Sequence, residues 1–155
     1  MRRKHAQYAQ HAQKEAPSLT VFLCPWKRLS NMKHFWLPGT KSCGINTVGI
    51  SDKSIIPDGQ MTASSQYSDN YQPFYGRLHG ERGDGWCSKT ANGDEDWLQV
   101  DLGKTTEVCA VATQGDINGN EWITDFKLSY SSDGNKWTTY KDKNGAEVVR
   151  FHCTC

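Results

Sequence analysis

Two apolar runs separated by a short polar stretch form the clearest pattern in the chain. Leu98, Val100 and Leu102 alternate with polar residues, which is the period of a strand that buries one face. Gly103 ends this run, and residues 108–115 then form a second run of small apolar side chains that suits a strand covered on both faces. The pattern predicts two adjacent core strands.

Further short strands are predicted on both sides of this pair. No window keeps the three- and four-residue apolar spacing of an amphipathic helix, whereas 17 aromatic residues, 14 glycines and 5 prolines favour strands and turns. The fold class is therefore predicted to be all-β. The other predicted strands cover residues 60–65, 126–131, 137–140 and 147–151, with turns at 57–59, 132–135 and 144–145.

Charge is distributed unevenly along a chain whose 155 residues suit one domain. Residues 1–42 hold eight Lys or Arg against the single acid Glu15, a net charge of +7, while residues 43–155 have a net charge of −6. A basic arm could touch nucleic acid or anionic lipid. Because no nucleic-acid-binding motif accompanies the charge, we expect a basic, disordered tail over 1–42, a domain over 43–155 and no nucleic-acid partner.

No targeting or membrane segment is evident in the sequence. The apolar run 19–24 is shorter than a signal-peptide core and is followed at once by Pro25 and Trp26. No stretch approaches the roughly 20 apolar residues of a membrane span. If the domain is extracellular, we expect its natural start to lie upstream of this chain.

Cysteine usage indicates an extracellular protein. Six cysteines are many for a cytosolic chain, and no pair has the two-residue spacing of a zinc or redox motif. Cys87 precedes the first core strand and Cys109 lies in the second, so we predict that they form a disulfide worth about 3 kcal/mol in the chain-entropy model. Cys153 and Cys155, one residue apart after His152, have poor zinc spacing, and we predict no metal and no cofactor.

Residues 66–75 are unusually rich in aromatic side chains. They carry four aromatic side chains, Tyr67, Tyr71, Phe74 and Tyr75, with neither helical nor strand period, which predicts a loop. Aromatic residues on a loop either pack against one another or form a contact surface, and the sequence supports both alternatives equally.

A tripeptide of the integrin-binding type, Arg82, Gly83 and Asp84, lies in a glycine-rich connection. Turn residues produce such matches by chance, so it stays a side hypothesis. Candidate catalytic residues, such as the acidic run 94–96, are scattered along the sequence, and we predict that the chain is not an enzyme.

Several of these phrases together resemble the discoidin domain, also called the coagulation factor V/VIII type C domain. The central one is Trp97-Leu98-Gln99-Val100-Asp101-Leu102-Gly103, and the others are residues 56–58, 62–65, 76–78, 111–115 and 127–137, in family order. The resemblance implies a jelly-roll β-sandwich of the galactose-binding type from Cys43 to about residue 151. It also leads us to expect an incomplete C-terminus, an unassigned partner for Cys43 and reduced stability, because family members continue through further strands.

The resemblance implies a non-catalytic binding or adhesion module, extracellular or on the cell surface. Its ligand would be a cell-surface glycan, an anionic phospholipid or an extracellular protein, held by loops at one end of the sandwich. The alternatives are a carbohydrate-binding module accessory to an enzyme and a non-functional fragment. By position the implied contacts are Tyr67, Tyr71, Phe74, Tyr75 and Ile117, clustered at that end with at least two exposed rings. Framework roles are implied for Arg77, Trp86, Trp97 and Trp137.

Overall fold

The computed structural model describes a set of short strands and 3-10 turns. The described residues are 5–8, 18–20, 33–36, 49–78, 85–89, 96–104, 106, 108, 110–114 and 125–150. Its strands are β1 His5–Tyr8, β2 Ser18–Thr20, β3 Lys33–Trp36, β4 Met61–Ala63, β5 Leu98–Asp101, β6 Ala110–Thr113, β7 Asp125–Ser131, β8 Thr138–Thr139 and β9 Val148–Arg150. Three 3-10 helices, η1 Asp58–Gln60, η2 Asp69–Tyr71 and η3 Pro73–Gly76, surround β4 in sequence.

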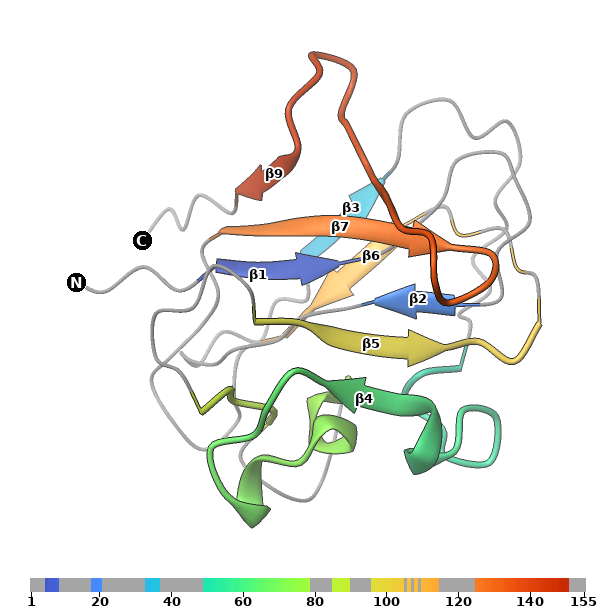
Figure 1. Ribbon diagram of the computed structural model, residues 1–155, viewed down its shortest axis with the longest axis vertical. Coiled ribbons are helices and arrows are strands. Elements are labelled where there is room, and N and C mark those ends of the chain that lie inside the picture. The colour runs from blue at the N-terminus through green and yellow to red at the C-terminus, as the bar shows by residue number, and fades with distance from the viewer. Residues whose placement is uncertain are drawn as a thin grey trace.

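The larger sheet contains seven strands, in the order β1-β7-β2-β5-β4, with β8 and β9 also paired to β7 (Figure 1). β1 runs parallel to β7, and the other pairs in this sheet are antiparallel. β5 and β7 therefore point the same way, with β2 running in the opposite direction between them. β4 is at the edge of this order.

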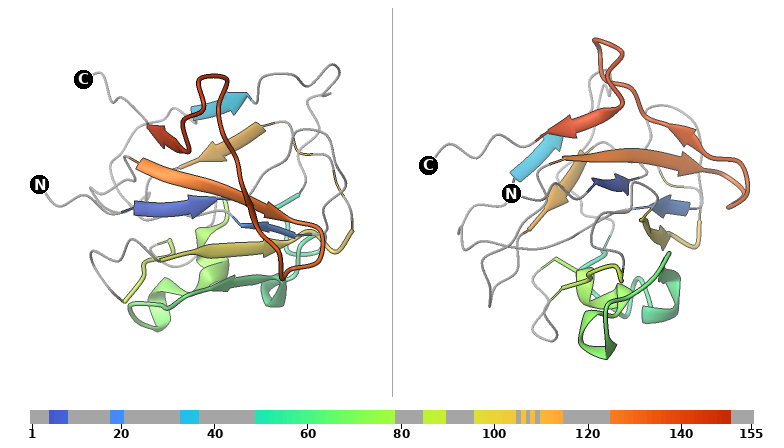
Figure 2. Two further views of the ribbon diagram at one scale, coloured as in Figure 1. Left: turned by 45° about the horizontal axis from the view of Figure 1, so that its top comes forward. Right: turned by 60° about the vertical axis from the view of Figure 1, so that its left-hand side comes forward.

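A second sheet made of β3 and β6 lies behind the first and crosses it obliquely (Figures 1 and 2). One buried cluster links the two layers, because Val111 of β6 belongs to the same core as Leu98 and Val100 of β5 and Leu128 of β7. Burial of these apolar side chains drives the packing of the two layers. The all-β prediction is confirmed, and the architecture is a β-sandwich.

The predicted alternation holds well in the central strand. In β5, Leu98 and Val100 are fully buried while Gln99 and Asp101 are half-buried. In β7, Phe126 and Leu128 are buried as expected, but Ser131 is buried and Tyr130 only half-buried. The Ser131 hydroxyl accepts a hydrogen bond from the Gly134 amide of the hairpin that follows, and half-buried Tyr130 still packs against the core.

The prediction that the two central apolar runs form adjacent strands is wrong. β5 pairs with β2 and β4, whereas β6 pairs with β3 in the other sheet. The connection after Gly103 therefore crosses from one layer to the other. Small apolar side chains suit a buried strand in either sheet, so the composition of residues 108–115 did not show which sheet the strand would join.

The N-terminal segment differs from the expected disordered tail at three places. β1, β2 and β3 all fall within residues 1–42, and each pairs with a strand from beyond residue 96. Backbone pairing needs no apolar side-chain pattern, which explains why the sequence did not indicate it. The other residues of 1–42, and Cys43, lie outside the described part of the chain.

The hairpin between β7 and β8 confirms a predicted turn. The Asp133 carboxylate accepts hydrogen bonds from the backbone amides of Asn135 and Lys136, each 2.8 Å, and from the Ser131 hydroxyl at 3.0 Å. Gly134 takes a φ of 72°, which a side chain would disfavour. Trp137, expected in the framework, leaves this turn 38% exposed.

These contacts predict a pH dependence that originates in the hairpin. The amides of Lys136 and Asn135, and then the Ser131 hydroxyl, hold the pKa of Asp133 below its ordinary value. The carboxylate therefore stabilises the fold above the unfolded pKa of about 3.9, and this contribution is lost as the pH falls through the lower folded pKa. Asp133→Asn keeps an acceptor oxygen without the titration. Its urea midpoint should fall less than the wild-type midpoint between about pH 5 and pH 3, and equal losses would contradict the assignment.

Candidate functional site

Strand direction decides which loops share an end of the sandwich. β4 runs antiparallel to β5, so the loop that follows Ala63 leaves the sheet where β5 begins. β7 points the same way as β5, so it also begins at this end, on the left in Figure 1. The aromatic loop 66–75 therefore leaves the main sheet at the end where β5 and β7 begin. The hairpin after Ser131 lies at the opposite end.

The aromatic loop contains two 3-10 turns and one exposed ring. Tyr67 is 65% exposed, and its ring meets that of Tyr71 edge-on with centroids 5.6 Å apart. Tyr71 and Phe74 are half-buried against the core, and half-buried Tyr75 contacts Phe74 edge-on at 4.8 Å. Both alternatives left open by the sequence are thus present. Three rings form the packing of the loop, and one is available to a partner, where at least two were expected.

The backbone that leads into Tyr67 is held by residues 86–89. The amide of Tyr67 donates to the carbonyl of Cys87 at 2.8 Å. The indole Nε1 of Trp86, a residue only 1% exposed, donates to the carbonyl of Ser65 at 2.8 Å, and the amide of Lys89 donates to the Ser65 hydroxyl at 3.0 Å. An exposed ring is therefore carried on a backbone fixed by a buried anchor.

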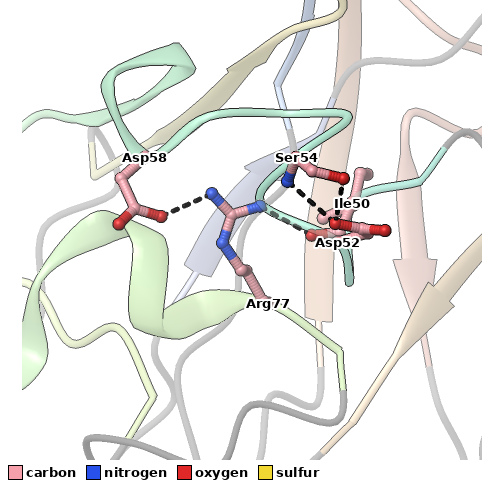
Figure 3. Close-up of polar contacts among 5 residues, drawn as sticks. All are labelled: Ile50, Asp52, Ser54, Asp58 and Arg77. Carbon is pink, nitrogen blue, oxygen red and sulfur yellow. Dashed lines mark hydrogen bonds and ion pairs between the residues drawn. The ribbon is translucent and has the colours of Figure 1, made fainter.

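A second anchor holds the far end of the loop. The Arg77 side chain, 8% exposed, follows η3 and reaches the turn that precedes β4 (Figure 3). Its Nη1 donates to the Ile50 carbonyl at 2.8 Å and its Nη2 pairs with the Asp58 carboxylate at 2.7 Å. The Asp52 side chain closes the same turn by accepting from the amide and hydroxyl of Ser54. The arginine thus fastens the loop to a closed turn.

The Asp52 carboxylate is the titrating group of that turn with a shifted pKa. The hydroxyl and then the amide of Ser54 lower the pKa of Asp52, and the Arg77 charge adds a smaller effect in the same direction. The carboxylate therefore stays ionised at neutral pH and keeps both hydrogen bonds.

The loop itself carries little charge. Residues 64–76 contain one acid, Asp69, and no Lys or Arg. Exposed hydroxyl and amide groups of Ser68 and Asn70 adjoin the Tyr67 ring in sequence. The loop's own side chains near the exposed ring are therefore polar and include no cation, and the nearest described lysine along its anchor is exposed Lys89, whose amide bonds Ser65.

Other predicted site residues lie outside the described residues. They are Ile117, the tripeptide Arg82, Gly83 and Asp84, and Cys109. Cys87, whose predicted partner is Cys109, is buried, and its Sγ lies 3.6 Å from the Ser88 carbonyl oxygen. The disulfide and the other assignments therefore stay predictions.

The described residues contain neither a cluster of metal ligands nor a membrane-spanning helix. No group of three or more His, Cys, Asp or Glu side chains among them could hold a metal ion. No helix in the same part of the chain is long and apolar enough to cross a bilayer.

The resemblance implied framework roles for Arg77 and Trp86, but the sequence did not indicate which residues they would contact to anchor the loop. The Arg77 contact to Asp58 spans 19 residues, and the Trp86 contact to Ser65 spans 21. Neither pairing has a local pattern, although an isolated arginine beside an aromatic loop and a tryptophan beside a cysteine are residues that proteins often use as anchors.

Comparison with known proteins identifies the family of the chain. The model of the F5/8 type C domain matches residues 60–153. The human epithelial discoidin domain-containing receptor 1 is 38% identical over 108 residues, covering 66% of this chain and 12% of the receptor. Pig lactadherin is 35% identical over 113 residues, covering 67% of this chain and 27% of lactadherin. The chain thus spans only a small part of each relative, and no solved structure gives a significant match. The family match covers more than half of the chain, which therefore belongs to the F5/8 type C, or discoidin, domain family.

Proposed function

We propose that this chain is an extracellular, non-catalytic binding module that holds an uncharged polar ligand at the end of the sandwich formed by the aromatic loop. The observation that carries the proposal is the 65% exposure of the Tyr67 ring on a backbone held by Cys87 and Trp86. A ring whose backbone is already ordered loses little conformational freedom on binding. The family match and the two relatives, a receptor and lactadherin, support a binding role.

The charge of the loop favours one ligand class among those that the family resemblance implies. An anionic phospholipid head group attracts clustered Lys or Arg, and residues 64–76 contain neither. A tyrosine ring flanked by hydroxyl and amide side chains suits the apolar face and the hydroxyl groups of a sugar ring. We therefore propose a glycan, free or on a glycoprotein, as the ligand. Ile117 stays a proposed additional contact.

Binding of the full chain to a glycan array, run beside sedimentation with phosphatidylserine vesicles, tests this proposal. We expect array binding, little vesicle binding, and a loss of about fivefold or more on the array for Tyr67→Ala, because one stacked aromatic ring is worth about 1 kcal/mol or more. Tyr67→Phe keeps the ring and should retain most of the binding.

Ile55→Ala is the matched surface control. Ile55 is 58% exposed, in the turn before β4 rather than in the aromatic loop, and its truncation should leave binding unchanged. Vesicle binding without array binding would contradict the glycan assignment, whereas equal loss with Tyr67→Ala and Ile55→Ala would contradict the site.

A further inference from the structure

A three-residue strand from the N-terminal segment lies between two strands of the core sheet. β2 pairs with β5 through Ser18↔Asp101 and Leu19↔Val100, and with β7 through Ser18↔Ser131, Leu19↔Tyr130 and Thr20↔Ser129. β5 and β7 do not pair with each other, and Figure 1 shows β2 between them. Among the described strands, β5 and β7 are thus joined into one sheet through β2.

Hydrogen bonds between β5 and the residues that flank β4 show toward which neighbour each β5 residue points its backbone N–H and C=O. The amide of Ser64 donates to the carbonyl of Trp97 at 2.9 Å, and the side chain of Gln60 donates to the carbonyl of Asp101 at 2.9 Å. Odd-numbered residues of β5 therefore direct their backbone groups toward β4. In an antiparallel ladder alternate residues face opposite neighbours, so Val100 directs its N–H and C=O toward Leu19 of β2.

The same reasoning applied to β7 gives a consistent result. The amide of Tyr140 donates to the carbonyl of Leu128 at 2.7 Å, so even-numbered residues near the end of β7 face β8. Ser129 and Ser131 then face β2, opposite Thr20 and Ser18. In both ladders, the backbone N–H and C=O of Leu19 must point toward β5, and those of Ser18 and Thr20 toward β7. Successive residues of a strand point their backbone groups to opposite sides, so β2 can pair with both neighbours.

Burial makes these backbone groups dependent on a partner strand. Val100 is 0% exposed and Ser131 is 1% exposed. A buried backbone N–H or C=O without a partner is costly, so both residues need an extended segment in the gap between β5 and β7. Opposite net charge also favours docking of the N-terminal segment on the domain, because residues 1–42 have a net charge of +7 and residues 43–155 a net charge of −6.

We propose that the gap between β5 and β7 is a strand-binding site and that residues 18–20 of the N-terminal segment are its ligand. The ligand class is an extended peptide recognised by main-chain hydrogen bonds, as in strand addition. This role is separate from the proposed glycan site, which lies in the loop 66–75.

Amide hydrogen exchange of the full chain, measured residue by residue with NMR, tests the proposal. In the wild type, the Val100 and Ser131 amides, which face β2, should be protected as strongly as that of Gln99, which faces β4. Leu19→Pro removes the amide that faces Val100, so exchange at Val100 and Ser131 should accelerate by about tenfold or more relative to Gln99. Leu19→Ala keeps the amide and should retain protection.

A peptide with the sequence of residues 14–23, added to the Leu19→Pro chain, should restore protection at Val100 and Ser131, whereas the same peptide carrying Leu19→Pro should not. If the Leu19→Pro chain unfolds globally, recovery of its fold on adding the peptide supports residues 18–20 as a ligand strand. Failure of the peptide to restore the fold overturns the proposal. Free exchange of Val100 in the wild type, or unchanged exchange in Leu19→Pro, would equally overturn the proposal.

Discussion

Trp86→Ala should lower the free energy of unfolding by about 3–5 kcal/mol, the range for truncating a large buried aromatic side chain. Trp86 is 1% exposed and belongs to the core shared by the two layers. Its indole N–H also holds the Ser65 carbonyl, so the substitution removes both a packed ring and a hydrogen bond at the base of the aromatic loop. Urea unfolding followed by circular dichroism gives the measurement.

Two matched variants separate burial from the hydrogen bond. Trp86→Phe keeps most of the ring but leaves the Ser65 carbonyl without its donor, and should cost about 1–3 kcal/mol. Trp137→Ala removes a ring that is 38% exposed, and should cost less than about 1 kcal/mol. A similar loss for Trp86→Ala and Trp137→Ala would contradict the assignment of Trp86 as the buried anchor.

Arg77→Met should lower the free energy of unfolding by about 2–3 kcal/mol. The substitution fills similar space while removing the donors to the Ile50 carbonyl and the Asp58 carboxylate. Asp58 is about half-exposed and can be hydrated once Arg77 is gone. Most of the loss in stability should therefore come from the lost hydrogen bond to the Ile50 carbonyl. The Arg77 Nε has no hydrogen-bond partner among the described residues, so its removal costs little.

Lys141→Met is the control for the ion pair of Arg77. Lys141 pairs with Glu147 at 3.0 Å, but both side chains are well exposed, and losing that pair should change stability by less than about 1 kcal/mol. Arg77→Lys keeps the charge with a single donor group and should fall between wild type and Arg77→Met. Equal effects of Arg77→Met and Lys141→Met would show that the buried arginine does not hold the loop.

Much of the sandwich could be predicted from the sequence because its strands bury alternate residues. β4, β5, β7, β8 and the hairpin turn between β7 and β8 were visible as alternation or as turn residues such as Gly134. Gly145, like Gly134, takes a positive φ, but the turn at 144–145 joins β8 and β9, which both pair with β7 and do not form the predicted hairpin. Pairing between strands was less visible. β5 and β6 lie in different sheets, and the strands of the N-terminal segment depend on backbone bonds that leave no apolar pattern.

The candidate site could be predicted as a loop but not as a surface. Four aromatic residues in ten indicated residues 66–75, yet exposure divides them, with Tyr67 outside and Tyr71 and Phe74 against the core. That division follows from tertiary anchors at Trp86 and Arg77, which are 19 and 10 residues from Tyr67 in the chain. Sequence spacing does not encode which ring such anchors turn outward.

An NMR titration tests whether the aromatic loop holds the ligand. The isotope-labelled full chain is titrated with the saccharide that binds most strongly on the array, and backbone amide shifts are followed. We expect the largest shifts within residues 66–75, around Tyr67, with the hairpin 132–137 at the opposite end unchanged. Shifts centred on that hairpin, or saturable binding that leaves 66–75 unperturbed, would contradict it.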